Sequence, residues 1–355
     1  MKNNWFGKSL GGGISSHDFL FKKIIAPENI FGAWREFQKG KMKKTDVLEF
    51  AQRAEENLFC LISDLAKDCY AHGKYIRFIV CDPKRREIAK APVRDRVLHH
   101  AIHRVLNPIF EPSFIFDSYS SRKEKGTHRA VKRLFDFAQK ISRNHTKTVW
   151  VLQLDIKNFF DSVDHSILIT LLRKKIGDEK AMRLPGIILR SYEKSDNKGI
   201  PLGNLTSQLF SNVYLDLLDQ FVKRKLEVKF YLRYADDMAI LSSDRNFLEN
   251  CLIRISNFIE ENLKVKIHPQ KTSLKKWHQG IDFLGYVIFP NHLVLRTKTK
   301  RRMLKNIEDK QKKFKAGLIN KKTFNSTLQS YFGVLGHCNN FVIKRKIEDI
   351  VNNVI

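Results

Sequence analysis

Apolar residues follow two patterns along the chain, and each pattern predicts one kind of element. Short apolar or alternating runs, which are typical of strands, occupy residues 74–81, 148–154, 229–241 and 277–288. Apolar residues at helical spacing fill most of the remainder. The longest of these segments are residues 31–70, 93–106, 131–141, 167–176, 205–221, 245–263 and the stretch beyond 296. Strands mixed with helices in this way predict an α+β fold, with an antiparallel sheet backed by helices.

Three Asp residues fall where predicted strands end. Asp155 directly follows the apolar run 148–154, and Asp236 and Asp237 occupy an apparent hairpin turn within 229–241. Neighbouring carboxylates repel each other, and a buried Asp needs a partner or a metal. If the strands pair antiparallel, the three carboxylates meet, as a two-metal phosphoryl transfer requires, with ions roughly 3.5–4 Å apart. For the Asp-Asp pair alone, a solvated polar turn is the alternative.

The charge balance indicates a polyanionic partner. The chain has 65 Lys and Arg against 37 Asp and Glu, a formal net charge of +28, which favours nucleic acid. The 43% of hydrophobic residues argue against a disordered basic tail. No apolar run approaches about 18 residues, so we expect no membrane partner. The N-terminus lacks the apolar segment of a secretory signal, and five Cys without a Cys-x-x-Cys pair fit a reducing cytoplasm.

Four motifs occur in the order of the palm motifs of reverse transcriptases. They are residues 155–161 (Asp-Ile-Lys-Asn-Phe-Phe-Asp), 199–208 (Gly-Ile-Pro-Leu-Gly-Asn-Leu-Thr-Ser-Gln), 234–237 (Tyr-Ala-Asp-Asp) and 283–286 (Phe-Leu-Gly-Tyr). On these motifs the chain resembles that family, which implies a right-hand polymerase with fingers, palm and α-helical thumb. The implied divisions are an N-terminal helical extension of the fingers (1–70), fingers (71–147), palm (148–292, with 71–292 as the polymerase core) and a basic thumb (293–355).

Within that family, the chain resembles the reverse transcriptases of diversity-generating retroelements. It shares with them Gly203, Ser207 and Gln208 as Gly-x-x-x-Ser-Gln, whereas most other reverse transcriptases have Gln at the position of Leu202 and Pro at that of Gln208. The resemblance implies error-prone copying of a dedicated template RNA, notably opposite adenines. Met is usual in that group at the position of Ala235. Ala is common there in group II intron, retron and defence-associated enzymes, and these roles are the alternative.

The resemblance also implies the residues of the site. The catalytic set is Asp155, Asp236, Asp237 and Lys271. Lys271 would protonate the leaving pyrophosphate, or it is a surface Lys that binds phosphate. Two Mg²⁺ ions, for which Mn²⁺ can substitute, are expected at the three Asp residues and Ile156. The implied nucleotide contacts are Lys84, Arg86, Phe160, Gly203 and Gln208; the implied nucleic-acid contacts are Arg94, Arg96, Ser207, Phe283, Gly285, Tyr286, Lys300 and Arg301.

Phe160 is the main indication of DNA synthesis. In reverse transcriptases the aromatic ring at this position lies where a ribose 2′-hydroxyl would be, so it excludes ribonucleotides. The alternative is a ring that fills the core, and Phe159 beside it shows the ambiguity. For Lys84 and Arg86, the alternative to binding a nucleotide triphosphate is an exposed turn with solvated charges.

The resemblance implies several partners. They are template RNA, the cDNA/RNA duplex, deoxynucleotides and a basic, oligomeric accessory protein in a bacterial or phage-encoded system. A catalytically idle RNA-binding protein is the alternative of another class, and the intact set of three Asp residues argues against it. An RNA polymerase or primase is opposed by Phe160.

Overall fold

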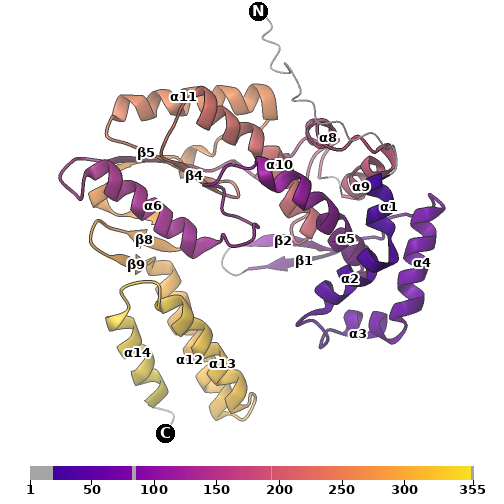
Figure 1. The fold of residues 1–355 in the computed structure, drawn as a ribbon. Coiled ribbons are helices and arrows are strands. Elements are labelled where there is room, and N and C mark those ends of the chain that lie inside the picture. The colour runs from indigo at the N-terminus through magenta and orange to yellow at the C-terminus, as the bar shows by residue number, and fades with distance from the viewer. Residues whose placement is uncertain (1–18, 82–84, 193, 353–355) are drawn as a thin grey trace, which may run out of the picture. The chain divides into compact units, whose positions relative to one another are not determined.

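The computed structural model describes residues 19–81, 85–192 and 194–352 (Figure 1). The chain divides into two compact units, and neither is a continuous segment. The first unit contains the residues up to 114, together with 158–219 and 261–265; the second contains 115–157, 220–260 and 266–355. The predicted fingers, palm and thumb are each one continuous segment of the chain, and their boundaries stay a prediction.

The first unit is mainly helical and is built around one long helix, α5 (Val93–Phe110). Four N-terminal helices pack against α5, namely α1 (Phe19–Ile25), α2 (Pro27–Gln38), α3 (Thr45–Gln52) and α4 (Ala54–Ala66). An antiparallel hairpin precedes α5 and pairs β1 (Ile76–Val80) with β2 (Arg86–Lys90). The remaining elements are η1 (Glu111–Ser113), α7 (Phe159–Ser162), α8 (His165–Arg173), α9 (Glu179–Arg190) and α10 (Leu205–Gln220). Leu98 and Ile102 of α5 are fully buried, as their helical spacing predicts.

The second unit contains a four-stranded antiparallel sheet in the order β4-β5-β3-β6. Its strands are β3 (Trp150–Leu154), β4 (Tyr231–Tyr234), β5 (Asp237–Ser242) and β6 (Ser273–Lys276). Helix α6 (Thr127–Ser142) packs against β4 and β5. Alternate residues of the strands, including Val151 and Leu241, join α6 residues such as Leu134 in one apolar core, as the period of two in a strand requires. The antiparallel sheet backed by a helix that the sequence predicts is therefore present, and its assignment as the palm stays a prediction.

A second, three-stranded sheet and a C-terminal helical group complete this unit. The sheet has the order β7 (Ile281–Phe283), β8 (Tyr286–Ile288) and β9 (Leu293–Leu295). The helices are α12 (Thr297–Lys315), α13 (Lys321–Leu335) and α14 (Phe341–Asn352), drawn in yellow tones in Figure 1. The unit also contains η2 (Phe221–Lys225), α11 (Arg245–Leu263, of which 245–260 belong to this unit), η3 (Pro269–Lys271) and η4 (Trp277–Gln279). Among the described residues, no helix is both long enough and apolar enough to span a membrane.

Candidate active site

Strand pairing in the second unit brings two of the predicted carboxylates together. Strand β3 is central in the sheet, and its last residue, Leu154, lies opposite Met238 of β5. The next step along both antiparallel strands places Asp155 beside Asp237, the first residue of β5. The apolar run of β3 is buried between its neighbours, so the strand end holds Asp155 in place with only 7% of its surface exposed.

A two-residue turn joins β4 to β5 and carries Asp236. Tyr234 pairs with Asp237, which leaves Ala235 and Asp236 as the turn. Ala235 has a φ of 52°, in the left-handed region. Such a conformation costs a non-glycine residue on the order of 1 kcal/mol, so surrounding contacts must hold the turn.

The surroundings of the carboxylates strongly shift the pKa of Asp237. Lys271 Nζ lies 2.6 Å from Asp155 Oδ1, and the backbone N–H of His268 donates to the Asp155 carbonyl at 2.7 Å. Burial, followed by the negative charges of Asp236 and Asp155, raises the pKa of Asp237 to about 7. A hydrogen bond with Asp155 also raises this pKa, and the Lys271 ammonium acts in the opposite direction. Three acidic groups thus share a small space in which their negative charge is costly.

The donor chemistry of this space fits a hard divalent cation. Buried carboxylate oxygens are the ligands that Mg²⁺ prefers, and a cation would relieve the repulsion that raises the pKa of Asp237. As the described side chains stand, no three His, Cys, Asp or Glu residues are arranged to hold one ion. Ile156 has a buried side chain, and its main chain forms an antiparallel bridge with Ile267. Its predicted metal contact stays a prediction.

Comparison with known proteins decides the family. Residues 81–288, more than half of the chain, match the family described as Reverse transcriptase (RNA-dependent DNA polymerase). The chain belongs to the reverse transcriptase family.

Its relatives include proteins encoded by group II introns. The chain is 24% identical to the group II intron-encoded protein LtrA of Lactococcus lactis subsp. cremoris, covering 92% of this chain and 63% of that protein. It is 26% identical to Protein YkfC of Escherichia coli K12, covering 57% of this chain and 63% of that protein. It thus spans less than two thirds of the length of these relatives. An apo telomerase structure from Candida tropicalis has a TM-score of 0.50 at 11% identity, covering 85% and 62% of the two chains. This likeness supports the α+β right-hand polymerase fold.

Arg233, which the sequence analysis did not single out, lies beneath the turn that carries Asp236. Its side chain is fully buried, and its guanidinium Nη1 donates a hydrogen bond to the carbonyl of Ala235 at 3.0 Å. Its backbone is also fixed, because its N–H donates to Asp117 and its carbonyl accepts from Tyr119, both at 2.9 Å. The signal in the sequence was an Arg within an otherwise apolar strand, immediately before the Tyr-Ala-Asp-Asp motif.

Arg233→Lys is expected to slow primer extension about 10- to 100-fold, which corresponds to about 1.4–2.7 kcal/mol. Lys keeps the positive charge but loses the planar guanidinium that reaches Ala235, so the strained turn loses its support. The extension rate and the thermal unfolding temperature should be measured together. Arg245→Lys, which alters an exposed Arg on α11, is the matched control. Equal rates for the two variants would exclude a positioning role for Arg233.

In the first unit the neighbouring rings of Phe159 and Phe160 differ in burial. Phe159 is only 1% exposed and packs near Tyr214, with ring centroids 6.2 Å apart. Phe160 is half-buried, and its ring meets that of Phe159 edge-on. The core-filling role therefore belongs to Phe159, and Phe160 is the ring with surface left for a ligand.

Neighbouring residues of the motif at the start of α10 also differ in burial. Gln208 is exposed, whereas Ser207 is 1% exposed and its hydroxyl has no hydrogen-bond partner among the described residues. Gly203 has a φ of 111°, a conformation that glycine tolerates best. Gln208 and Gly203 can thus meet a ligand directly, whereas a contact from Ser207 would require the helix start to rearrange.

The predicted basic residues of the first unit differ in their surroundings. Arg86, at the start of β2, is exposed, and Lys84 lies outside the described residues. Arg94 is paired with Asp64, and Arg96 with Asp46. These ion pairs tie α5 to the helices before it, although the buried Nε of Arg96 has no hydrogen-bond partner among the described residues. Their role as phosphate contacts stays a prediction.

The Phe-Leu-Gly-Tyr motif forms the β7–β8 turn of the second unit. Leu284 and Gly285 both have positive φ, 50° and 90°, as a tight two-residue hairpin requires. The side chains of Phe283 and Tyr286 are 3% exposed and belong to the core, so among these motif residues Gly285 is the better placed to meet a strand. On α12, Arg301 is exposed and Lys300 is half-buried. They lie at the start of a helix whose buried side chains are Met303 and Ile307.

Proposed function

We propose that the protein is an RNA-directed DNA polymerase that makes cDNA from a dedicated template RNA. The observation that carries the proposal is the pair of strand ends that sets Asp155 beside Asp237, with Asp236 in the turn between β4 and β5. A pure RNA-binding protein gains nothing from partly buried carboxylates next to phosphates. The family match and the group II intron-encoded relatives support a polymerase.

In this proposal Asp155, Asp236 and Asp237 would hold two Mg²⁺ ions, and the chemistry such ions would supply is activation of the primer hydroxyl and stabilisation of the leaving oxygen. The carboxylates bind and orient, and strand pairing holds them in register so that little reorganisation is needed. Lys271, whose ammonium is paired with Asp155, would donate a proton to the leaving pyrophosphate. Template RNA and the cDNA duplex would meet the exposed Lys and Arg of α12 through their phosphates.

Primer extension on an RNA template with deoxynucleotides and Mg²⁺ tests this function. Phe160→Ala should lower the preference for deoxynucleotides over ribonucleotides about 10- to 100-fold, a change of about 1.4–2.7 kcal/mol in discrimination. Removing the half-buried ring leaves room for a 2′-hydroxyl. Phe159→Leu is the control, because that ring is buried in the core and its change should lower stability without changing sugar preference. Unaltered discrimination in Phe160→Ala would refute the assignment of this ring.

Error-prone copying in a diversity-generating retroelement is the finer form of the proposal. Gly203 and Gln208 support this form of the proposal, because Gln208 is exposed at the start of α10 and can hydrogen-bond a base or sugar. The double variant Leu202→Gln, Gln208→Pro should reduce misincorporation opposite template adenines several-fold, measured by sequencing the cDNA. An unchanged error spectrum would break the link between this motif and fidelity.

A group II intron-like, retron-like or defence-associated role is the second candidate. Ala235 and the group II intron-encoded relatives favour it. A template and variable repeat pair beside the gene would support the retroelement role, and a different dedicated RNA would support this one. The basic accessory protein belongs to the retroelement proposal alone.

A further inference from the structure

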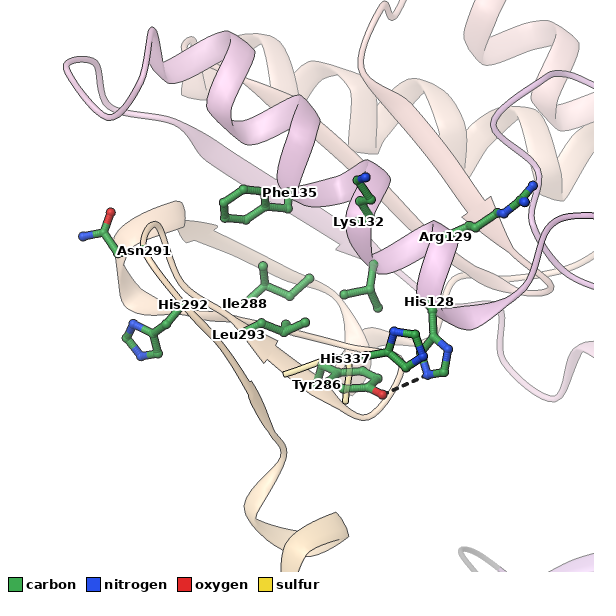
Figure 2. A pocket seen from close by; sticks show the side chains of 11 residues that line it. His128, Arg129, Lys132, Phe135, Tyr286, Ile288, Asn291, His292, Leu293 and His337 are labelled. Carbon is green, nitrogen blue, oxygen red and sulfur yellow. Dashed lines mark hydrogen bonds between the residues drawn. The ribbon is translucent and has the colours of Figure 1, made fainter. Parts of the chain in front are cut away.

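A cavity of about 450 Å³ lies within the second unit, and none of the three carboxylates lines it (Figure 2). Its walls come from the first turns of α6, from strand β8 with the turn into β9, and from His337 after α13. This volume falls in the roughly 300–1,000 Å³ range of sites for small molecules. The polymerase reaction proposed above uses none of its walls except Tyr286.

The floor of the cavity is apolar. Val131 and Phe135 of α6 face Ile288 and Leu293 of the hairpin across it, as Figure 2 shows for the labelled members. The flat ring of Phe135 and the branched side chains opposite it fit a planar ligand, because aromatic faces gain from stacking as well as from burial.

The rim of the cavity is cationic. Arg129 and Lys132 of α6 are both exposed and line it, and none of its lining residues is an Asp or Glu. Among the described residues, neither forms an ion pair; Arg129 donates to the backbone carbonyl of Glu124. A ligand that combines a planar body with an anionic group therefore complements both parts of the cavity.

Stacked imidazoles close one end of the cavity. The rings of His128 and His337 lie 3.6 Å apart between centroids, at 25° to each other. His128 Nε2 lies 3.0 Å from the hydroxyl of Tyr286, the hydrogen bond drawn in Figure 2. This contact fixes the His128 ring, so the cavity has a preformed aromatic wall.

We propose that this cavity binds one unpaired nucleotide, with its base between Phe135 and Leu293 and its phosphate at Arg129 and Lys132. The nucleotide is either a free mononucleotide or part of a bound single strand, because both offer the same base and phosphate. The inference goes beyond the polymerase reaction and rests on the proposed function only for the supply of a nucleic-acid strand.

Photo-crosslinking tests the proposal on the full chain. The probes are 5-iodouridine monophosphate and a short single-stranded RNA with one 5-iodouridine, irradiated in EDTA without deoxynucleotides, and the attached peptides are identified by mass spectrometry. Attachment to the peptide that contains Phe135 is expected. Leu293→Trp, which fills the cavity, and Lys132→Glu, which reverses the rim charge, should each reduce the yield at least about tenfold, equivalent to about 1.4 kcal/mol.

Lys140→Glu is the matched control, since Lys140 is also exposed on α6 but does not line this cavity. It makes the same change in net charge and should keep the wild-type yield. Attachment of both probes indicates a site for free nucleotides as well, and attachment of the RNA alone indicates a strand site. Equal yields in wild type and Lys132→Glu, or attachment only elsewhere, overturn the proposal. Irradiation needs neither metal nor synthesis, so an inactive polymerase that still crosslinks would refute the proposed function and leave the cavity site standing.

Discussion

Asp236→Asn is expected to reduce primer extension on an RNA template at least about 10³-fold, a loss of about 4 kcal/mol of transition-state stabilisation. Asn has the shape of Asp but no negative charge, so the β4–β5 turn keeps its two residues while a cation loses a ligand. Catalysis of phosphoryl transfer depends on positioning and on neutralising charge. A substitution that removes only charge therefore affects the reaction more than the fold.

The measurement is the single-turnover rate of extension with deoxynucleotides and Mg²⁺, alongside the circular dichroism spectrum of each variant. Asp349→Asn, which changes an exposed residue of α14, removes the same charge elsewhere and should extend at the wild-type rate. An Asp236→Asn variant that extends within about tenfold of wild type would show that the carboxylates by the turn are structural. The proposed role of Asp236 as a metal ligand would then be wrong. A wild type that does not extend at all would instead indicate an RNA-binding member of the family.

The sequence predicted the carboxylates because strand ends are visible in an apolar pattern. The run 148–154 and the alternation in 229–241 both became strands of one antiparallel sheet. Antiparallel pairing in the observed register then places Asp155 beside Asp237. Periodicity and strand direction predicted that the carboxylates meet, whereas the register that sets which of them are opposite comes from the structure.

Interactions between segments distant in the sequence could not be predicted in the same way. The pairing of Arg94 with Asp64 and of Arg96 with Asp46 depends on how α5 packs against α3 and α4, and no periodicity encodes it. Segment 31–70 proved to be three helices rather than one continuous stretch. Helix α9 was not predicted; it contains Pro185, a residue usually disfavoured inside helices, and it begins at the capping side chain of Asp178.

The sequence also could not predict which side chains near the site would be buried. A charged Arg in a strand could have faced solvent, yet Arg233 lies fully buried under the turn. Likewise, Phe159 and Phe160 are the same residue type, and only the packing of Phe159 near Tyr214 distinguishes them. Packing decides which of two chemically equal neighbours remains available to a ligand.

Without divalent metal, Asp237→Asn is expected to make the protein more stable than wild type at pH 8, by on the order of 2–4 kcal/mol. The pKa of Asp237 is raised to about 7 in the folded chain, first by burial and then by Asp236 and Asp155, whereas an unfolded Asp has a pKa of about 3.9. The folded state therefore holds this proton more tightly than the unfolded state. The stabilisation is fully present below the unfolded pKa and is lost as the pH rises through about 7. Asn carries no ionisable proton, so the variant does not lose this stability as the pH rises.

Urea denaturation in EDTA from pH 4 to pH 8 measures the effect. The free-energy difference between Asp237→Asn and wild type should grow up to about pH 7 and then level off, while Asp349→Asn should run parallel to wild type. Adding Mg²⁺ at pH 8 should stabilise wild type and leave Asp237→Asn almost unchanged, because a ligand stabilises only the folded state that binds it. A difference that is constant with pH would mean that Asp237 ionises normally in the folded chain. A difference that grows with pH but does not respond to Mg²⁺ would mean that the carboxylates repel each other without forming a metal site, which separates the electrostatics of the site from its proposed chemistry.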